Sequence, residues 1–307
     1  MIRLNTYSRE FEDIYYDIVK IRLADLGDRI VTSSKAYLPP DFYGPGDALK
    51  QLVLAPFAKL KGAMEHMHIG SAAEAAMKAE CFLSSGGFTG DYKLYHNTYD
   101  KLITSMVKSK PASIQMNVKI VRECGISTCP YCNRDFINSR AEKVSGAQLD
   151  HFYSRSAYPF FAVSLYNLVP VCGNCNRVKS ASTKALVSPF DDTADFVNGI
   201  CFSFSGGKIK LTGTGDFENN VKVMRLEEAY QIHDVDAIEL IRKSKVYTNS
   251  QLKEIQRLLV SNKKSVSMKR LEEHIFGKGM TPDSFGRWPL SKFKHDILKE
   301  TSAASRK

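Results

Sequence analysis

Apolar residues in the first 120 positions recur at the three-and-four spacing of amphipathic helices. The spacing over 11–18 predicts one such helix, which we expect to end near Gly27. Proline and glycine between positions 33 and 47 predict a loop, and Ser71 is placed to cap a helix over 72–82. We expect residues 1–120 to be mainly helical and to serve packing or partner docking, with no chemistry of their own.

The middle of the chain contains two short strand-like segments. They cover 148–151 and 168–171, and a polar, helix-like segment starts at Asn176. The order strand, strand, helix predicts a ββα unit, within a core that we place at 121–200.

After this core, residues 200–204 and 208–212 alternate in polarity around Gly206-Gly207, which predicts a β-hairpin. Residues 227–260 predict one or two helices, with Ile238 and Leu252 among their core positions. The predicted fold class is therefore α+β. A ββα core is flanked by a mainly helical N-terminal region over 1–120 and by a hairpin with basic helices over 201–307.

Composition is that of a globular protein. The chain has 307 residues and 43% of them are apolar, enough for a buried core and for two domains. No apolar run approaches the length of about 18 residues that a membrane span needs, so we expect no membrane partner. The seven cysteines are an odd number and no apolar signal segment opens the chain, which favours the reducing cytoplasm over a disulfide framework.

Positive charge is concentrated at the C-terminal end. The formal net charge, Lys and Arg minus Asp and Glu, is +2 for residues 1–120, +1 for 121–200 and +7 for 201–307, which gives the total of +10. A basic region of this kind suits a polyanion, and contacts to phosphates would add affinity that does not depend on sequence. Ordinary solubility is the alternative explanation for the charge.

Four cysteines form two C-x-x-C pairs, Cys129 with Cys132 and Cys172 with Cys175, and 39 residues separate the pairs. Two such turns can bring four thiolates onto one tetrahedral ion, so the spacing predicts a structural Zn²⁺ site. A redox pair fits poorly, because two pairs enclose a loop that contains basic residues and histidine. A zinc ribbon that binds or braces without catalysis is the plainer alternative. The other three cysteines are expected to be ordinary buried thiols.

The residues between the two pairs carry the chemistry. Asp150 and His151 are adjacent on the first predicted strand, so their side chains point to opposite faces and one can bind a metal while the other faces a water. Asn167 stands at the start of the second strand, where a side-chain amide can hold a long loop by bonding to its backbone. Asn176 directly follows Cys175, so metal binding by the cysteines would fix its direction.

Over 129–181 these residues resemble the HNH family of ββα-metal nucleases, with Asp150, His151, Asn167 and Asn176 in family order and an Asn-Arg-x-Lys-Ser ending at Ser180. The resemblance implies a zinc-braced HNH core with His151 as general base. It further implies that Asp150 and Asn176 are ligands of a catalytic Mg²⁺ or Mn²⁺ and that Asn167 holds the base in place. A histidine titrates near neutral pH and can take a proton from water, which suits the implied reaction.

A second resemblance lies in residues 150–159 and in the segment Ser-Pro-Phe-Asp over 188–191. Both are similar to the HNH subunit of Septu-type and retron-associated anti-phage defence systems. This similarity implies a nuclease effector that works beside an SMC-like, ABC-type ATPase.

DNA is the expected substrate. The cations expected to hold its phosphates are Arg155, Arg177, Lys179, Lys263, Lys264, Lys269 and Arg270. Two alternatives stay open from the residues alone. One is a non-cleaving zinc-braced nucleic-acid-binding module, and the other is an RNA-cutting HNH toxin, since such a site contacts a phosphate before a sugar.

Overall fold

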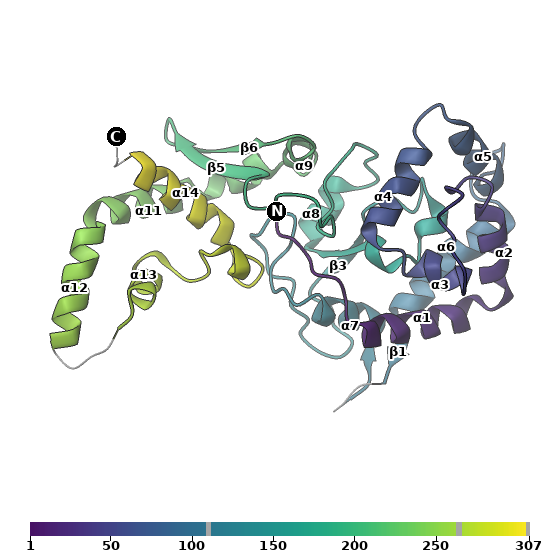
Figure 1. Cartoon of the computed structure of the whole chain (residues 1–307), viewed down its shortest axis with the longest axis horizontal. Helices are drawn as coiled ribbons and strands as arrows, with labels where there is room; N and C mark the ends of the chain where they lie inside the picture. Colours follow the sequence, from purple (N-terminus) through teal and green to yellow (C-terminus); the bar gives the residue numbers. More distant parts are fainter. Residues whose placement is uncertain (109–111, 262–265, 305–307) are drawn as a thin grey trace.

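Helices dominate the computed structural model, which describes residues 1–108, 112–261 and 266–304 (Figure 1). Within these ranges, three two-stranded antiparallel sheets accompany the helices. The predicted α+β class is confirmed at this level of helices and small sheets. No helix in the described ranges is both long and apolar enough to cross a bilayer.

The N-terminal region is helical, as predicted. It comprises α1 (Arg9–Leu23), α2 (Asp25–Ser34), α3 (Ala48–Val53), α4 (Phe57–His66), α5 (Ala72–Cys81) and α6 (Gly90–Ile103). Ser71 caps α5 by accepting a hydrogen bond from the Glu74 amide, which confirms the predicted helix start. The predicted helix end near Gly27 is wrong. α1 ends at Leu23 because Ala24 takes a positive φ of 45°, and Gly27 lies inside α2 against Leu49.

The N-terminal region ends with β1 (Met106–Val107) and β2 (Ile114–Gln115), and α7 (Met116–Glu123) leads from it into the central region. β3 (Gln148–His151) then pairs antiparallel with β4 (Leu168–Val171), and α8 (Gly173–Lys179) follows β4 directly. The loop between the two strands contains the short 3-10 turns η1 (Pro159–Phe161) and η2 (Leu165–Asn167). The predicted order of strand, strand and helix is therefore present.

The C-terminal region starts with the predicted hairpin, β5 (Ile200–Ser205) and β6 (Lys208–Gly213). Its turn residues Gly206 and Gly207 have φ of 59° and 78°, values that favour glycine in a two-residue turn. The helices that follow are α9 (Phe217–Val223), α10 (Leu226–Tyr230), α11 (Asp234–Val246), α12 (Asn249–Ser261), α13 (Met268–Phe276) and α14 (Ser291–Ala304), with η3 (Gln231–His233) and η4 (Pro282–Ser284) between them.

The predicted helical character of 227–260 is confirmed, but one predicted core position is not. Leu252 is buried, whereas Ile238 on α11 is 51% exposed. α12 and α13 form an arm at the end of the molecule opposite α2 and α5 (Figure 1).

The three predicted regions share one contiguous apolar cluster, which extends from Met1 to Ile297. Asn133, immediately after Cys132, joins the last helix to the first cysteine pair. Its Nδ2 donates to the Phe285 carbonyl at 2.7 Å, and its Oδ1 accepts from the Lys292 amide at 3.0 Å. The segment before α1 contacts the same cysteine loop, since the Ile2 amide donates to the Pro130 carbonyl at 2.7 Å. The N-terminal segment and the start of α14 therefore pack against the loop that carries the first cysteine pair.

Candidate functional site

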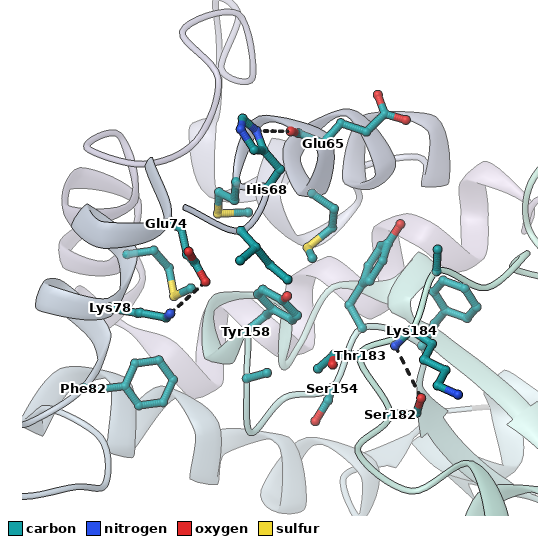
Figure 2. Close-up of a pocket in the computed structure, with 18 of the residues that line it drawn as sticks. Glu65, His68, Glu74, Lys78, Phe82, Ser154, Tyr158, Ser182, Thr183 and Lys184 are labelled. Atoms are coloured by element: carbon teal, nitrogen blue, oxygen red, sulfur yellow. Dashed lines mark hydrogen bonds and ion pairs between the residues drawn. The ribbon is translucent and has the colours of Figure 1, made fainter. Parts of the chain in front are cut away.

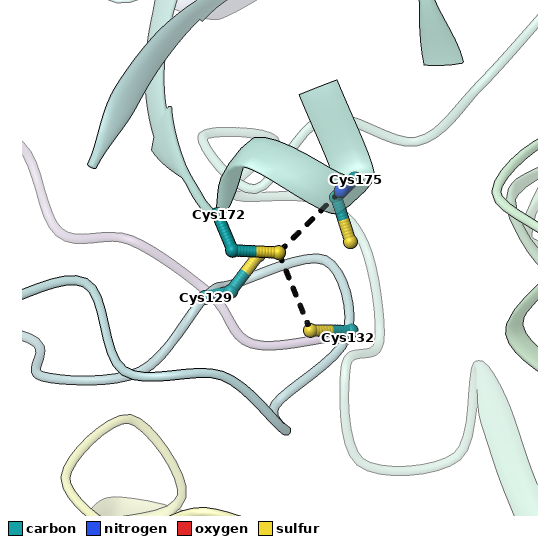
Figure 3. A group of neighbouring side chains, drawn as sticks. All are labelled: Cys129, Cys132, Cys172 and Cys175. Carbon is teal, nitrogen blue, oxygen red and sulfur yellow. Dashed lines mark hydrogen bonds between the residues drawn. The ribbon is translucent and has the colours of Figure 1, made fainter. Parts of the chain in front are cut away.

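The four paired cysteines converge at the base of α8. Cys129 and Cys132 lie in the loop after α7, and Cys172 and Cys175 lie where β4 passes into α8 (Figure 3). All four are buried and their sulfur atoms lie within 4.8 Å of one another. The Cys175 and Arg134 amides donate to the sulfurs of Cys172 and Cys132, both at 3.4 Å. Buried, amide-supported sulfurs at this separation can hold a metal ion, and four of them suit a tetrahedral ion such as Zn²⁺.

The remaining cysteines stand apart from this cluster. Burial raises the pKa of Cys81 to about 12 and that of Cys124 to about 11, so both are protonated at neutral pH. Cys201 on β5 is half-buried. Among the described residues no second group of histidine, cysteine and carboxylate side chains comes close enough to hold a metal.

Tyr131 connects the cysteine cluster to β3. It stands inside the first cysteine pair and is fully buried, and its hydroxyl donates to Asp150 Oδ2 at 2.6 Å. Lys179 approaches the same carboxylate from α8, with Nζ 3.0 Å from Oδ2 and 3.1 Å from Oδ1. Burial raises the pKa of Asp150, while the charge of Lys179 and the hydrogen bonds from Lys179 and Tyr131 oppose that rise.

The position of Lys179 differs from the expectation that it holds a flanking phosphate. Its side chain is 0% exposed, and its Nζ also donates a hydrogen bond to the His151 carbonyl at 3.0 Å. The physical reason is the short length of α8, whose last turn directs position 179 back onto β3. Lys179 in this state cannot contact a nucleic-acid backbone.

His151 lies on the opposite side of β3 from Asp150 and is partly buried. Its Nε2 is 2.9 Å from the Ala162 carbonyl, which accepts a hydrogen bond from the Nε2 proton and leaves Nδ1 as the acceptor nitrogen. Burial lowers the pKa of His151 to about 3, and the hydrogen bond to Ala162 opposes this shift only in part. The imidazole is therefore neutral and oriented, and the expectation that it titrates near neutral pH is wrong because burial disfavours its charged form.

The structure adds a residue that sequence reasoning missed. Tyr99 on α6 packs edge-on against His151 with ring centroids 4.5 Å apart. The Arg155 guanidinium lies over the Tyr99 ring, 4.6 Å from its centroid. Arg155 also forms an ion pair with Asp100 at 3.4 Å. The region 1–120, which we expected to lack chemistry, thus supplies a wall of the candidate site. No sequence motif indicates that Tyr99 belongs to this site.

Asn167 ties the loop between the strands to β4. It is fully buried, its Oδ1 accepts from the Tyr153 amide at 2.8 Å, and its Nδ2 donates to the carbonyls of Tyr153 at 3.0 Å and Phe161 at 3.1 Å. The predicted bonding of Asn167 to loop backbone is present. The Phe161 carbonyl that Asn167 holds immediately precedes Ala162, whose carbonyl contacts His151.

Asn176 lies on α8 facing the start of β3. Its Nδ2 donates to Gln148 Oε1 at 2.7 Å, which leaves the amide oxygen of Asn176 available as a ligand. Gln148 and Asp150 alternate along β3 and so share a face. An oxygen from Asn176 and a carboxylate from Asp150 are suitable donors for Mg²⁺. The fit is incomplete, however, because Tyr131 and Lys179 already use both Asp150 oxygens.

The other predicted cations lie further from these residues. Arg177 is exposed on α8 and donates to Asn174 Oδ1 at 2.8 Å. Lys269 and Arg270 are exposed on α13, which lies far from α8 and β3 in Figure 1. Lys263 and Lys264 lie outside the described residues.

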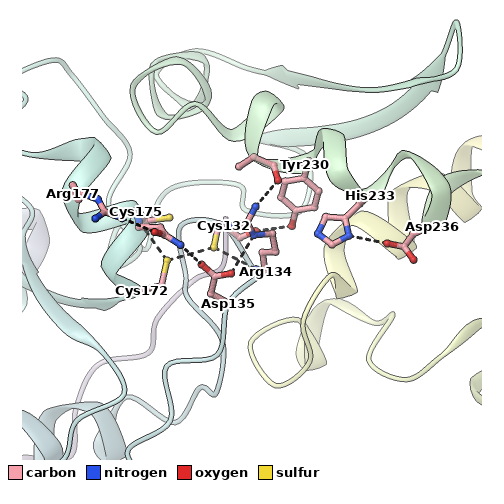
Figure 4. A network of polar contacts seen from close by, with 11 residues as sticks. Cys132, Arg134, Asp135, Cys172, Cys175, Arg177, Tyr230, His233 and Asp236 are labelled. Carbon is pink, nitrogen blue, oxygen red and sulfur yellow. Dashed lines mark hydrogen bonds and ion pairs between the residues drawn. The ribbon is translucent and has the colours of Figure 1, made fainter.

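The C-terminal region contacts the cysteine cluster through polar side chains (Figure 4). The Tyr230 hydroxyl donates to the Cys132 carbonyl at 2.6 Å, and Arg134 donates to the Ala229 carbonyl at 2.5 Å. Asp135 pairs with Arg134 at 3.2 Å and accepts from Asn174 on α8. These contacts link α10, the first cysteine pair and α8 in one network.

A cavity of about 1510 Å³ separates the helices α4 and α5 from the central region (Figure 2). Its walls include Tyr153 and Tyr158 from the loop after β3 and Lys184 from the segment after α8. The side chains of Asp150, His151 and Asn176 do not line it. The candidate catalytic residues therefore lie outside this cavity, on the faces of β3 and α8.

Comparison with known proteins found no matching family model, no similar curated protein and no similar solved structure.

Proposed function

We propose that this protein is a zinc-braced HNH endonuclease that hydrolyses DNA phosphodiester bonds with the help of Mg²⁺ or Mn²⁺. The observation that carries the proposal is the anchoring of His151 through Nε2, which leaves Nδ1 free of that bond and able to accept a proton. A binding module has no need of a neutral imidazole that a backbone carbonyl holds in one orientation. The usual chemistry of such an imidazole is proton transfer.

In this proposal each residue has a stated task. Nδ1 of His151 takes a proton from a water whose oxygen attacks the phosphorus. The bond from phosphorus to the 3′ oxygen breaks, and that oxygen takes up a proton from solvent, giving a 5′-phosphate and a 3′-hydroxyl. Tyr99 and the Ala162 carbonyl orient the ring, and Asn167 holds the preceding carbonyl, that of Phe161. Asp150 and Asn176 would hold the divalent cation, which supplies charge stabilisation of the phosphate and the leaving oxygen. The four cysteines would hold Zn²⁺ as a brace, with no open coordination position for catalysis.

The biological setting follows from the sequence resemblance alone. We propose that the nuclease acts as the effector of a bacterial anti-phage defence system beside an SMC-like, ABC-type ATPase. Expression with a candidate ATPase, followed by affinity purification and phage plating, tests the setting separately from the chemistry.

One observation favours a second candidate. The closed ion pair of Asp150 with Lys179 is what a non-cleaving zinc-braced nucleic-acid-binding module would use to stabilise its hairpin. Cleavage of plasmid and single-stranded DNA by the zinc-loaded protein, with and without Mg²⁺ or Mn²⁺, separates the two. Divalent-dependent cleavage supports the nuclease, and binding without cleavage under all these conditions supports the module.

A further inference from the structure

We propose that Lys179 holds Asp150 in a closed state and has to leave the carboxylate before a divalent cation binds there. The inference rests on the proposed nuclease function and deepens it, because it names what regulates entry of the catalytic cation. In this account Lys179 is a positioning residue that acts through Asp150.

The first argument is how closely the ammonium group is held. Lys179 Nζ donates hydrogen bonds to Asp150 Oδ1 at 3.1 Å and to the His151 carbonyl at 3.0 Å. It also forms an ion pair with Asp150 Oδ2 at 3.0 Å, so its charge faces both carboxylate oxygens. The group also lies 5.7 Å from the centre of the Phe152 ring, which covers it on another side. The position of the charge is thus fixed in a buried pocket.

The second argument is electrostatic. A Mg²⁺ bound to Asp150 would lie about 2.1 Å from a carboxylate oxygen, within a few ångströms of the ammonium that spans both oxygens. Repulsion between a divalent cation and an ammonium at that separation is strong where burial excludes water. Tyr131 is neutral and raises no such conflict, so its bond to Oδ2 can persist. When the divalent cation replaces Lys179, the negative charge of the buried Asp150 carboxylate remains paired with a positive charge, before and after the exchange.

The third argument concerns the destination of the released side chain. Lys179 is the last residue of α8, and Ser180 beyond it is exposed and has a positive φ of 47°. Arg177, two residues earlier, is exposed on the same helix. A Lys179 side chain that swings out at this helix end reaches the surface near Arg177, where a DNA phosphate can accept its charge. Cation binding and nucleic-acid binding then strengthen each other by the same factor.

The direct test is Mn²⁺ titration of the zinc-loaded protein, followed by electron paramagnetic resonance. Lys179→Met should bind Mn²⁺ at least about tenfold more tightly than wild type, because the competing charge is gone. Lys184→Met is the matched control, since Lys184 is exposed on the following segment, and it should bind as wild type does. Asp150→Ala should weaken Mn²⁺ binding at this site in both backgrounds.

The outcomes separate this inference from the proposed function. Equal Mn²⁺ affinity in wild type and Lys179→Met, with DNA cleavage intact in wild type, overturns the inference and leaves the nuclease standing. Absence of any Asp150-dependent Mn²⁺ site, together with absence of cleavage, overturns both.

A second measurement avoids the risk that Lys179→Met does not fold. In wild type, acetic anhydride labelling read by mass spectrometry should spare Lys179 without divalent cation and modify it once Mn²⁺ is added. Lys184 should react throughout and serves as the internal standard. Protection of Lys179 that persists when Mn²⁺ occupies the Asp150 site overturns the inference.

Discussion

The Tyr131 hydroxyl, in the loop of the first cysteine pair, donates a hydrogen bond to Oδ2 of Asp150 on β3 at 2.6 Å. Tyr131 lies between the two cysteines of the first pair, and Asp150 lies on the strand that also carries His151. The geometry of the cysteine cluster is therefore transmitted to the candidate catalytic strand by one buried contact. Loss of the metal would disturb Asp150 as well as the cluster.

Replacement of Tyr131 by Phe should lower the free energy of unfolding by about 1 to 2 kcal/mol, since a buried carboxylate loses a hydrogen-bond donor. Urea denaturation of the zinc-loaded protein measures this change. Tyr158→Phe is a suitable control, because Tyr158 is half-buried and lines the cavity instead of contacting Asp150. Equal loss in both variants would show that the Tyr131–Asp150 bond contributes nothing specific.

Metal analysis should find one tightly bound Zn²⁺ per chain. Cys175→Ser should lose it and give a protease-sensitive core, because metal binding by a small hairpin unit contributes directly to its folding free energy. Cys201→Ser, outside the cluster, should keep both the metal and the melting temperature of wild type. Full zinc occupancy and unchanged melting of Cys175→Ser would exclude this cluster as the zinc site.

The depressed pKa of His151 predicts a pH dependence of stability. In the unfolded chain the imidazole titrates near its ordinary value of about 6.5, whereas burial lowers its pKa to about 3 in the folded protein. The unfolded state then binds more protons between these values, so His151 contributes a loss of stability as pH falls from about 6.5 toward 3. His151→Asn should remove a part of that loss on the order of 1 kcal/mol between pH 7 and pH 5. Identical stability profiles of the two proteins over this window would contradict the shift.

The basic C-terminal region should contribute affinity without specificity. Neutralising Lys263, Lys264, Lys269 and Arg270 together should weaken binding to all DNA sequences. It should also reduce the slope of the salt dependence by about 0.9 for each phosphate that the variant no longer neutralises. Binding measured between about 50 and 200 mM salt gives the slope. An unchanged slope would assign this charge to solubility or to a protein partner.

Sequence spacing predicted the parts of the site that are close along the chain. The two C-x-x-C pairs, the hairpin of β3 and β4, and the bonding of Asn167 to loop backbone follow from local rules of turns and strands. Tyr99 could not be found in this way, because helical periodicity says which face of α6 is apolar and nothing about which strand it covers. Lys179 was misplaced for a related reason. A lysine at the end of a short polar helix is usually exposed, and only the fold shows that Asp150 lies within its reach.

The exposed Ile238 illustrates the same limit in the C-terminal region. Its spacing on α11 suits a buried position, but burial also depends on which elements pack against the helix, and Ile238 is 51% exposed. The spacing of apolar residues identified the helix correctly, but it could not identify which elements pack against the helix.

The central claim is that His151 is the general base of a divalent-dependent nuclease, and the most direct test compares cleavage by wild type and His151→Ala. Both proteins should be zinc-loaded and assayed on plasmid DNA with Mg²⁺ or Mn²⁺. The variant should retain fold, zinc and DNA binding, and should cleave about 10² to 10⁴ times more slowly, the usual contribution of a positioned acid or base. Asp150→Ala and Asn176→Ala serve as comparison, since higher cation concentration should partly restore their activity. Cleavage by His151→Ala at the wild-type rate would contradict the account.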